Sequence, residues 1–301
     1  MKKTNLILYL VLVSFGTFFF SSCKKEKITT HENLIIDGNV APNYEGVSLT
    51  EIEIYVSKLY IDLLGIQATQ AEINTHTTFL KTNDLRMGAR DTLIDLILTK
   101  DEYYDRLYNN AKGKYLEGIT EYQLNQEIAL QNYLVTTYYT VGDTFTAQYL
   151  EVLRNKLIIL TKIDSLYKNG YITFNQFYAT FSDNLVYDNI NMGSLNFVQS
   201  CFENYLLRQA TSSETTNGVK IVDGQSQVIL LKNGNSKTDF IRIVTESDEF
   251  YEGLVIDNYR AFISRNPTTY ESYQATFEFK NSNNLAQMQK SILKTDEYAG
   301  F

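Results

Sequence analysis

The sequence predicts an all-α fold of stacked multi-helix repeats, with a helical insert and a small β-hairpin excursion. Apolar residues recur at the three-and-four spacing of amphipathic helices along most of the chain. Two prolines in 301 residues leave few positions that oppose a helix. A segment at 55–103 returns in altered form at 197–250 and again at 259–298. Three copies of one unit are typical of proteins whose units stack and bury each other's apolar faces.

Residues 1–22 have the order of an export signal peptide. Lys2 and Lys3 precede an apolar run from 6 to 20, and two serines then lead to Cys23. The run is too short to span a membrane comfortably. The small residues before the cysteine resemble a bacterial lipobox, which implies cleavage before Cys23 and attachment of lipid there. An ordinary signal peptide with an unmodified Cys23 is the alternative.

The aromatic end of this signal, Phe18-Phe19-Phe20-Ser21-Ser22-Cys23, resembles lipoproteins of the Bacteroidota. The resemblance implies a lipid anchor in the outer membrane and leaves open whether the periplasmic or the surface face is occupied. Residues 23–48 are polar and lack periodicity, which is typical of a lipidated tether. Once Cys23 carries lipid, Cys201 has no disulfide partner, and its place on an apolar stripe predicts a small buried side chain.

The first repeat is expected at 49–112. Ser48 and Glu51 form a capping box, which predicts a helix that ends at Gly65. Thr69 and Glu72 form a second box that begins the next helix. A third helix follows the polar break at 81–84, and the acids at 101–102 suit the positive end of a fourth helix.

The second and third repeats are expected at 194–255 and 256–301. The capping box recurs in them as Thr211 with Glu214 and as Thr268 with Glu271. Within the second repeat, β-branched runs at 219–224 and 228–234 predict the two strands of a hairpin.

The helical insert is expected at 113–193. Apolar spacing predicts one long helix over 115–134, a second over 145–167 and a shorter third over 173–186, with a break at 142–143. The three are expected to pack on the repeats. The apolar positions drift too far from a strict heptad for the pattern to favour coiled-coil pairing.

Repeated carboxylates are the residues most easily mistaken for catalytic groups. Their spacing is accounted for by capping and by helix dipoles, so we interpret Glu72, Glu214 and Glu271 as structural. His31 and His76 are the two histidines of the chain, too few for a histidine metal cluster or a Ser-His-Asp arrangement. We therefore expect no catalytic residue, no cofactor and no metal site.

Four cations lie near the predicted joints between units and are expected to pair with the acidic helix starts of neighbouring units: Arg90, Arg208, Lys237 and Arg265. The chain carries 27 basic against 35 acidic residues, a net charge of −8. An acidic protein is a poor match for nucleic acid, which we exclude as a partner.

Two family resemblances rest on these motifs. The first copy, with Leu59-Tyr60-Ile61-Asp62-Leu63-Leu64-Gly65 and Thr69-x-x-Glu72, resembles the cytochrome-associated domain of planctomycete surface proteins. The later copies, with Asp239-Phe240-Ile241-Arg242 and Glu249-Phe250, resemble the helical repeat shared by a bacterial surface-protein family and the phycobilisome linker domains. The chain lacks a haem-attachment Cys-x-x-Cys-His, so no redox role is implied.

The sequence thus favours a non-enzymatic, lipid-anchored scaffold or interaction subunit of a cell-envelope assembly, with outer-membrane or surface proteins as partners. The alternative is a surface binding module for extracellular glycan or peptide, using the loop 212–237 and exposed tyrosines. The partner or ligand, and the part of the chain that holds it, stay open at this point.

Overall fold

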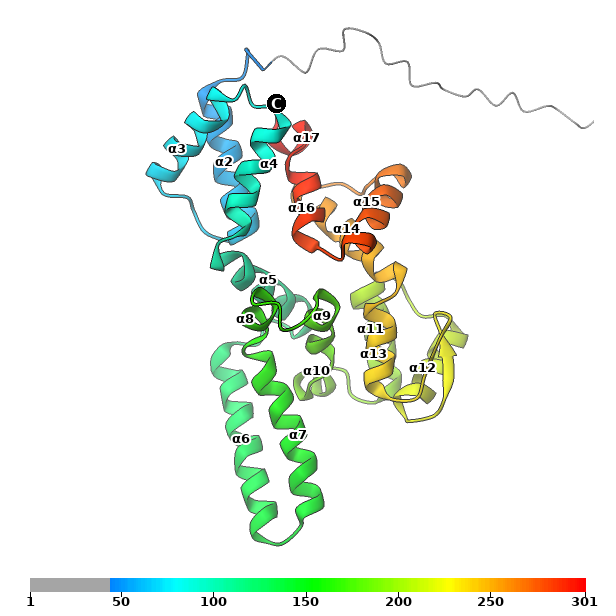
Figure 1. The fold of residues 1–301 in the computed structure, drawn as a ribbon. Helices are drawn as coiled ribbons and strands as arrows, with labels where there is room; N and C mark the ends of the chain where they lie inside the picture. Colours follow the sequence, from blue (N-terminus) through cyan, green and yellow to red (C-terminus); the bar gives the residue numbers. More distant parts are fainter. Residues whose placement is uncertain (1–43) are drawn as a thin grey trace, which may run out of the picture. The chain divides into compact units, whose positions relative to one another are not determined.

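The computed structural model describes residues 44–301, which form one compact unit. The predicted signal peptide, Cys23, His31 and most of the predicted tether lie outside the described residues. Within 44–301 the chain forms 16 helices and a two-stranded antiparallel hairpin, which confirms the all-α prediction and the small β excursion (Figure 1).

The first repeat consists of four helices: α2 (Leu49–Leu64), α3 (Gln70–Thr82), α4 (Met87–Leu98) and α5 (Asp101–Tyr115). Helix α2 packs against each of the other three, and α3 also contacts α4. Both predicted capping boxes are present, at Ser48 with Glu51 and at Thr69 with Glu72. Gly65 ends α2 with φ 72°, a left-handed conformation that glycine adopts without steric cost.

The other two repeats share a helix and pack in the same order. The second contains α11 (Ser194–Leu206), α12 (Ser212–Val222), α13 (Lys237–Thr245) and α14 (Asp248–Ile263). Helix α14 also serves as the first helix of the third repeat, followed by α15 (Thr269–Ser282), α16 (Leu285–Leu293) and α17 (Asp296–Ala299). In each repeat the first helix contacts the following three, and the second contacts the third.

The insert contains more and shorter helices than predicted: α6 (Glu121–Thr140), α7 (Thr144–Leu160), α8 (Ile163–Lys168), α9 (Phe174–Ser182) and α10 (Leu185–Ile190). Tyr115 belongs to α5, because Glu117 and Gly118 adopt positive φ and separate α5 from α6. The predicted helix over 145–167 breaks at 161–162, and the one over 173–186 breaks where Asn184 caps α10.

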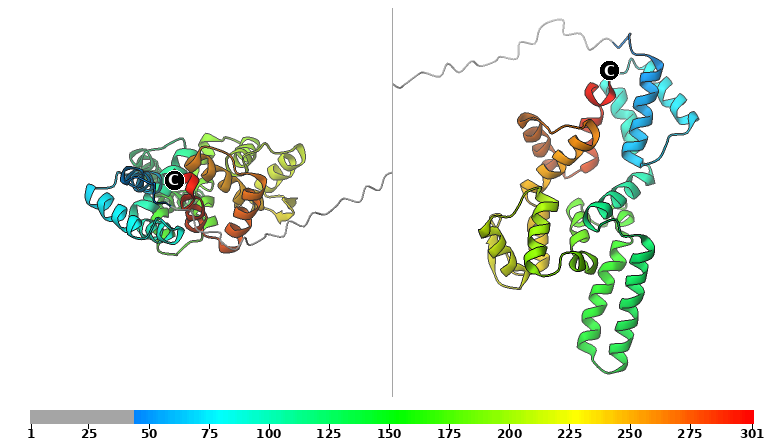
Figure 2. Two further views of the ribbon diagram at one scale, coloured as in Figure 1. Left: turned by 90° about the horizontal axis from the view of Figure 1, so that it is seen from above. Right: turned by 180° about the vertical axis from the view of Figure 1, so that it is seen from behind.

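Helices α6 and α7 pair with each other along their length, as both views show (Figures 1 and 2). Val135 on α6 and Ala147 on α7 are buried in the pair, while Leu124 and Leu157, nearer the base of the hairpin, join the main core. Helix α6 touches the first repeat at its start, where Glu121 accepts from Lys112 Nζ at 2.6 Å and from the Tyr108 hydroxyl at 2.8 Å, both on α5, but its main partner is α7. Helix α9 packs on the repeats, since it contacts α5 and α13.

The insert contains a degenerate fourth repeat unit. We call it the hidden unit, and its helices are α5, α6, α9 and α10. N-cap residues of the third and fourth helices stand eleven positions apart in the second and third repeats, at 236 and 247 and at 284 and 295. Thr173 and Asn184, which cap α9 and α10, keep this spacing. Thr120 and Gln123 form the capping box, and Thr120 stands five positions after Tyr115, the last residue of α5. The α6–α7 hairpin is thus an insertion between the unit's capping box at Thr120 and its third helix, α9.

The β-hairpin lies later than predicted. Val219–Val222 continues helix α12, and the strands are β1 (Gln227–Ile229) and β2 (Lys232–Gly234). Leu230 and Leu231 form the two-residue turn with φ 48° and 62°. This mirror-image turn normally uses Asn or Gly, so two leucines give no sequence signal for it.

Replacing Leu231 by glycine should stabilise the protein. Leu231 is 99% exposed, so its removal loses no packing, and a left-handed conformation costs a side-chain-bearing residue about 1–2 kcal/mol. Part of that gain is offset by the entropy of glycine, leaving about 0.5–1 kcal/mol. Urea denaturation checks this, with Val228→Gly in β1 as the control that should lower stability. A destabilised Leu231→Gly protein would contradict the turn assignment.

Arg90 joins the first and third repeats. Its side chain is fully buried on α4, where Nε donates to the Leu85 carbonyl at 2.9 Å and Nη1 to the Lys294 carbonyl at 2.7 Å. Nη2 donates to Asp296 Oδ1 at 2.7 Å and to the Tyr44 hydroxyl at 2.6 Å. Asp296 begins α17, so the predicted pairing of Arg90 with the acidic helix start of another unit is confirmed.

Arg90→Ala should cost about 3 kcal/mol or more of unfolding free energy, because it removes the donor of one buried and one partly buried carbonyl and opens a cavity. Asp296→Asn should cost about 1 kcal/mol, because that side chain is 42% exposed and water replaces the lost charge interaction. Chemical denaturation of both variants tests the difference. Equal losses would show that the salt bridge, and not the buried guanidinium, stabilises this joint.

Candidate binding grooves

The repeated carboxylates occupy caps, as the sequence predicts. Glu214 accepts from the Thr211 backbone N–H at 2.8 Å and from two nitrogens of Arg208. Glu271 has the same partners in Thr268 and Arg265. The hydrogen bonds from the arginine come first among the causes that lower the pKa of each glutamate to about 2. Carboxylates held this firmly in the ionised form are poor general bases.

The arginines pair differently from expectation. Arg208 and Arg265 bind acids of their own repeat, since each also bridges to the acidic start of the repeat's fourth helix, at Glu249 and Glu297. Lys237 pairs with Asp188 on α10, at the joint with the hidden unit. The prediction of bridges between units was therefore wrong for the two arginines. Each arginine is only six residues from its cap glutamate in sequence, so the ion pair within the repeat is the easier one to form.

The first repeat uses other residues around its cap. Glu72 accepts from Lys100 Nζ at 2.8 Å and from the Tyr60 hydroxyl at 3.1 Å, and its pKa falls to about 2, with the lysine bond as the first cause. His76 Nε2 lies 3.0 Å from the same hydroxyl. Burial lowers the pKa of His76, which favours the neutral ring as donor to the tyrosine oxygen. Glu72 and His76 stand one turn apart on α3, but Tyr60 comes from α2 and Lys100 from the start of α5, so no local sequence pattern predicts this network.

The caps predict a loss of stability in acid. Glu271 has a folded pKa of about 2 against an ordinary 4.5, so its contribution is complete above about pH 4.5 and is lost as pH falls towards 2. Glu271→Gln should lower the unfolding free energy at pH 7 by about 1 kcal/mol or less, because the pair is partly exposed, and should flatten its slope between pH 5 and 2. Glu203→Gln, an exposed position on α11, is the matched control. Parallel pH profiles for wild type and Glu271→Gln would contradict the assignment.

Cys201 is buried, as predicted, and packs beside the Tyr187 hydroxyl. Burial raises the pKa of its thiol to about 12. Among the described residues no group of three His, Cys, Asp or Glu side chains is placed to hold a metal ion. In the same part of the chain, no helix combines the length and hydropathy needed to cross a membrane.

The first of two grooves lies between α7, α9 and α13 and encloses about 590 Å³. Its apolar lining comes from Ile159, Ile172, Ala179 and Ile241. Ile241 is buried at the floor, while Ile159 is 45% exposed at one side. Val152, one heptad before Ile159 and 54% exposed, extends this apolar line along α7 beyond the groove. We call Val152, Ile159 and this cavity the α7–α9–α13 groove.

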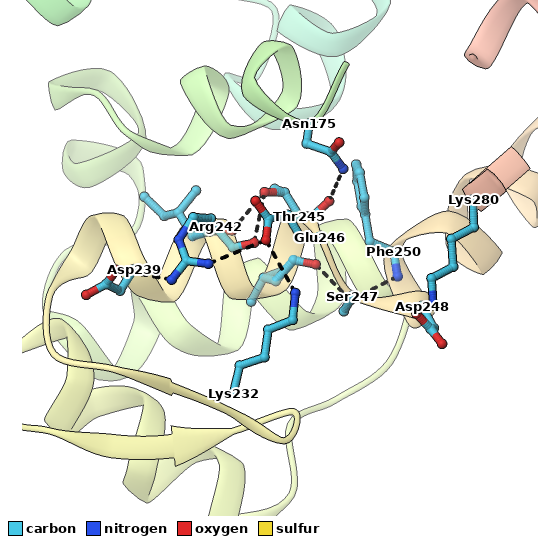
Figure 3. A network of polar contacts seen from close by, with 12 residues as sticks. Asn175, Lys232, Asp239, Arg242, Thr245, Glu246, Ser247, Asp248, Phe250 and Lys280 are labelled. Carbon is cyan, nitrogen blue, oxygen red and sulfur yellow. Dashed lines mark hydrogen bonds and ion pairs between the residues drawn. The ribbon is translucent and has the colours of Figure 1, made fainter. Parts of the chain in front are cut away.

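A polar network fixes one wall of this groove (Figure 3). Asn175 of α9 donates to the Thr245 carbonyl at 2.7 Å, which satisfies an acceptor in the last turn of α13. Arg242 reaches Asp239 at 3.3 Å and Glu246 at 3.4 Å, and Lys232 of β2 reaches Glu246 at 3.3 Å. These long, exposed contacts are weak, so the charges on the rim are able to exchange partners.

The opposite rim is held more firmly. Lys156 of α7 bonds Asp183, which follows α9, at 2.7 Å. The groove therefore has an apolar floor between two charged rims, one tight and one loosely paired. This is the arrangement that accepts an amphipathic helix, whose apolar face enters the groove while its polar edges meet the rims.

The second groove lies between α14 and α15 and encloses about 640 Å³. Tyr273 and Phe277 line it with their rings nearly parallel, 16° apart with centroids at 6.4 Å, and both are more than half exposed. Arg260, Asn266 and Glu252 supply polar groups around them. We call this the α14–α15 groove. The predicted loop 212–237 does not contribute to it.

Four tyrosines that could have formed a sugar-binding surface, at positions 103, 104, 138 and 139, do not come together. Tyr103 is buried in the core, where its hydroxyl donates to Gln289, and Tyr104 stacks edge-on against it. Tyr138 and Tyr139 lie on α6, in the insert. The grooves went unpredicted because each is formed by helices whose relative placement no local pattern encodes.

No family model, curated protein or solved structure matches this chain.

Proposed function

We propose that this chain is a non-enzymatic scaffold or interaction subunit of a cell-envelope assembly, held at the outer membrane by lipid on Cys23. The α7–α9–α13 groove carries the proposal, since its apolar floor and charged rims suit a helix of a partner protein. The carboxylates with the most perturbed pKa values are engaged at helix caps, where they stabilise the fold. The resemblance of the later copies to a linker repeat also favours assembly over catalysis.

The second candidate is a binding module for extracellular glycan or peptide, and the α14–α15 groove favours it. Exposed rings with polar neighbours are able to stack on sugar faces while the polar groups bind hydroxyls. The two candidates use different helices, so Tyr273→Ala and a substitution in the first groove separate them.

Ile159→Asp should weaken partner binding without unfolding the protein, because the side chain is 45% exposed and the charge enters only the groove. The full chain is purified by affinity from membranes in mild detergent. Wild type should bring down stoichiometric envelope proteins, and Ile159→Asp should lower their recovery about tenfold or more, as expected for placing a charge against an apolar face.

Ile54→Asp is the matched control, because Ile54 is exposed on α2, away from the groove. It should retain the partners. Wild-type protein that purifies alone contradicts the scaffold, and equal recovery with Ile159→Asp contradicts the groove. Loss of retention on glycan or peptide matrices by Tyr273→Ala alone would instead support the second candidate.

A further inference from the structure

The tip of the α6–α7 hairpin has a surface unlike the rest of the chain. We define the hairpin tip as residues 128–150, the end of α6, the turn and the start of α7. Asp143 is the one charged residue in it, whereas 21% of the whole chain is charged. The Asp143 carboxylate accepts from the Thr146 backbone N–H at 3.1 Å, so it serves as the cap of α7. A hairpin surrounded by water alone normally carries many more charges.

Exposed apolar and aromatic groups are ordered along the hairpin axis. Val141 and Phe145 lie at the turn, 70% and 83% exposed. Tyr133 lies seven residues before the end of α6 and Tyr149 five residues after the start of α7, about 8–11 Å back along their helices from the turn, and both are exposed. The next charges, Glu127 and Glu151, lie just outside the tip. Apart from the cap carboxylate of Asp143 at the turn, the series runs from aliphatic and phenyl groups through tyrosine rings to charges.

These groups lie on both helices, on the sides away from the hairpin's own core. Val135 and Ala147 fill the interface between α6 and α7, while Tyr133 and Tyr149 face outward. A single flat protein surface would cover one side only. A lipid interface covers all sides at once and has the same order of layers, with apolar groups deepest, tyrosines at the headgroups and charges in water.

We infer that the hairpin tip inserts into the interface of a lipid bilayer of low net charge. The tip offers no lysine or arginine to anionic headgroups, and its one charge is negative. Insertion is driven by Val141 and Phe145 entering the acyl boundary, with the tyrosine hydroxyls at headgroup level. This contact is separate from the lipid proposed on Cys23 and from the α7–α9–α13 groove.

The chain has no tryptophan, so one introduced ring reports on its own position. Val141→Trp is made in residues 23–301 with Cys23→Ser, which keeps the whole compact unit 44–301 and removes the anchor. With phosphatidylcholine–phosphatidylethanolamine vesicles, its emission should shift to the blue and quenching by aqueous iodide should fall about twofold, as expected for a ring moved ~5–10 Å into the interface. Added salt should leave the shift unchanged.

Tyr171→Trp, equally exposed between α8 and α9, is the matched control and should not shift. Phe145→Asp in the Val141→Trp chain should abolish the shift while far-ultraviolet circular dichroism stays native. No shift at Val141→Trp, or equal shifts at both reporters, overturns the proposal. A shift that appears with copurified envelope proteins and not with vesicles also overturns it and assigns the tip to a protein partner.

Discussion

The buried guanidinium of Arg90 is the interaction on which the arrangement of the repeats depends. A charged group fully removed from water persists only where its donors are satisfied, and Arg90 finds acceptors in three separate segments. Because those acceptors are Leu85 just before α4, the C-cap residue Lys294 of α16 and Asp296 of α17, the cation is satisfied only when the first and third repeats are in contact. Tyr44 and Phe301, near the two ends of the described chain, cover the guanidinium with their rings.

Shared helices explain how the other units stay together. Helix α14 ends one repeat and begins the next, and α5 has the same double role for the first repeat and the hidden unit. A shared helix buries two apolar faces, one towards each unit, so neither unit is complete without its neighbour. Gly253 allows this crowding on α14, because a Cβ there would lie 2.8 Å from the Tyr205 carbonyl oxygen. Stability is therefore distributed over the stack.

Local features were predictable from the sequence and distant ones were not. The capping boxes at Thr69, Thr211 and Thr268 involve atoms three residues apart, so a pattern of letters suffices to locate them. The β-branched run 219–222 was predicted as a strand, but burial of Ile221 against the core keeps it in α12, where packing outweighs intrinsic propensity. Arg90 did leave a signal, because it shares a helical face with the buried Leu93, Ile94 and Ile97. Its acceptors, about 200 residues away in sequence, left none.

The same distinction indicates where function resides. Positions common to the units are already engaged, since Glu72, Glu214 and Glu271 each accept from the backbone N–H of the cap threonine and pair with a cation. Surface groups are free to bind other molecules where a unit departs from the common pattern. The largest departure is the α6–α7 hairpin, which is inserted into the hidden unit. Helix α7 contributes Ile159 to the α7–α9–α13 groove at one end and Phe145 to the hairpin tip at the other. An insertion that leaves the unit's caps intact adds new surface while the contacts that hold the stack together are kept.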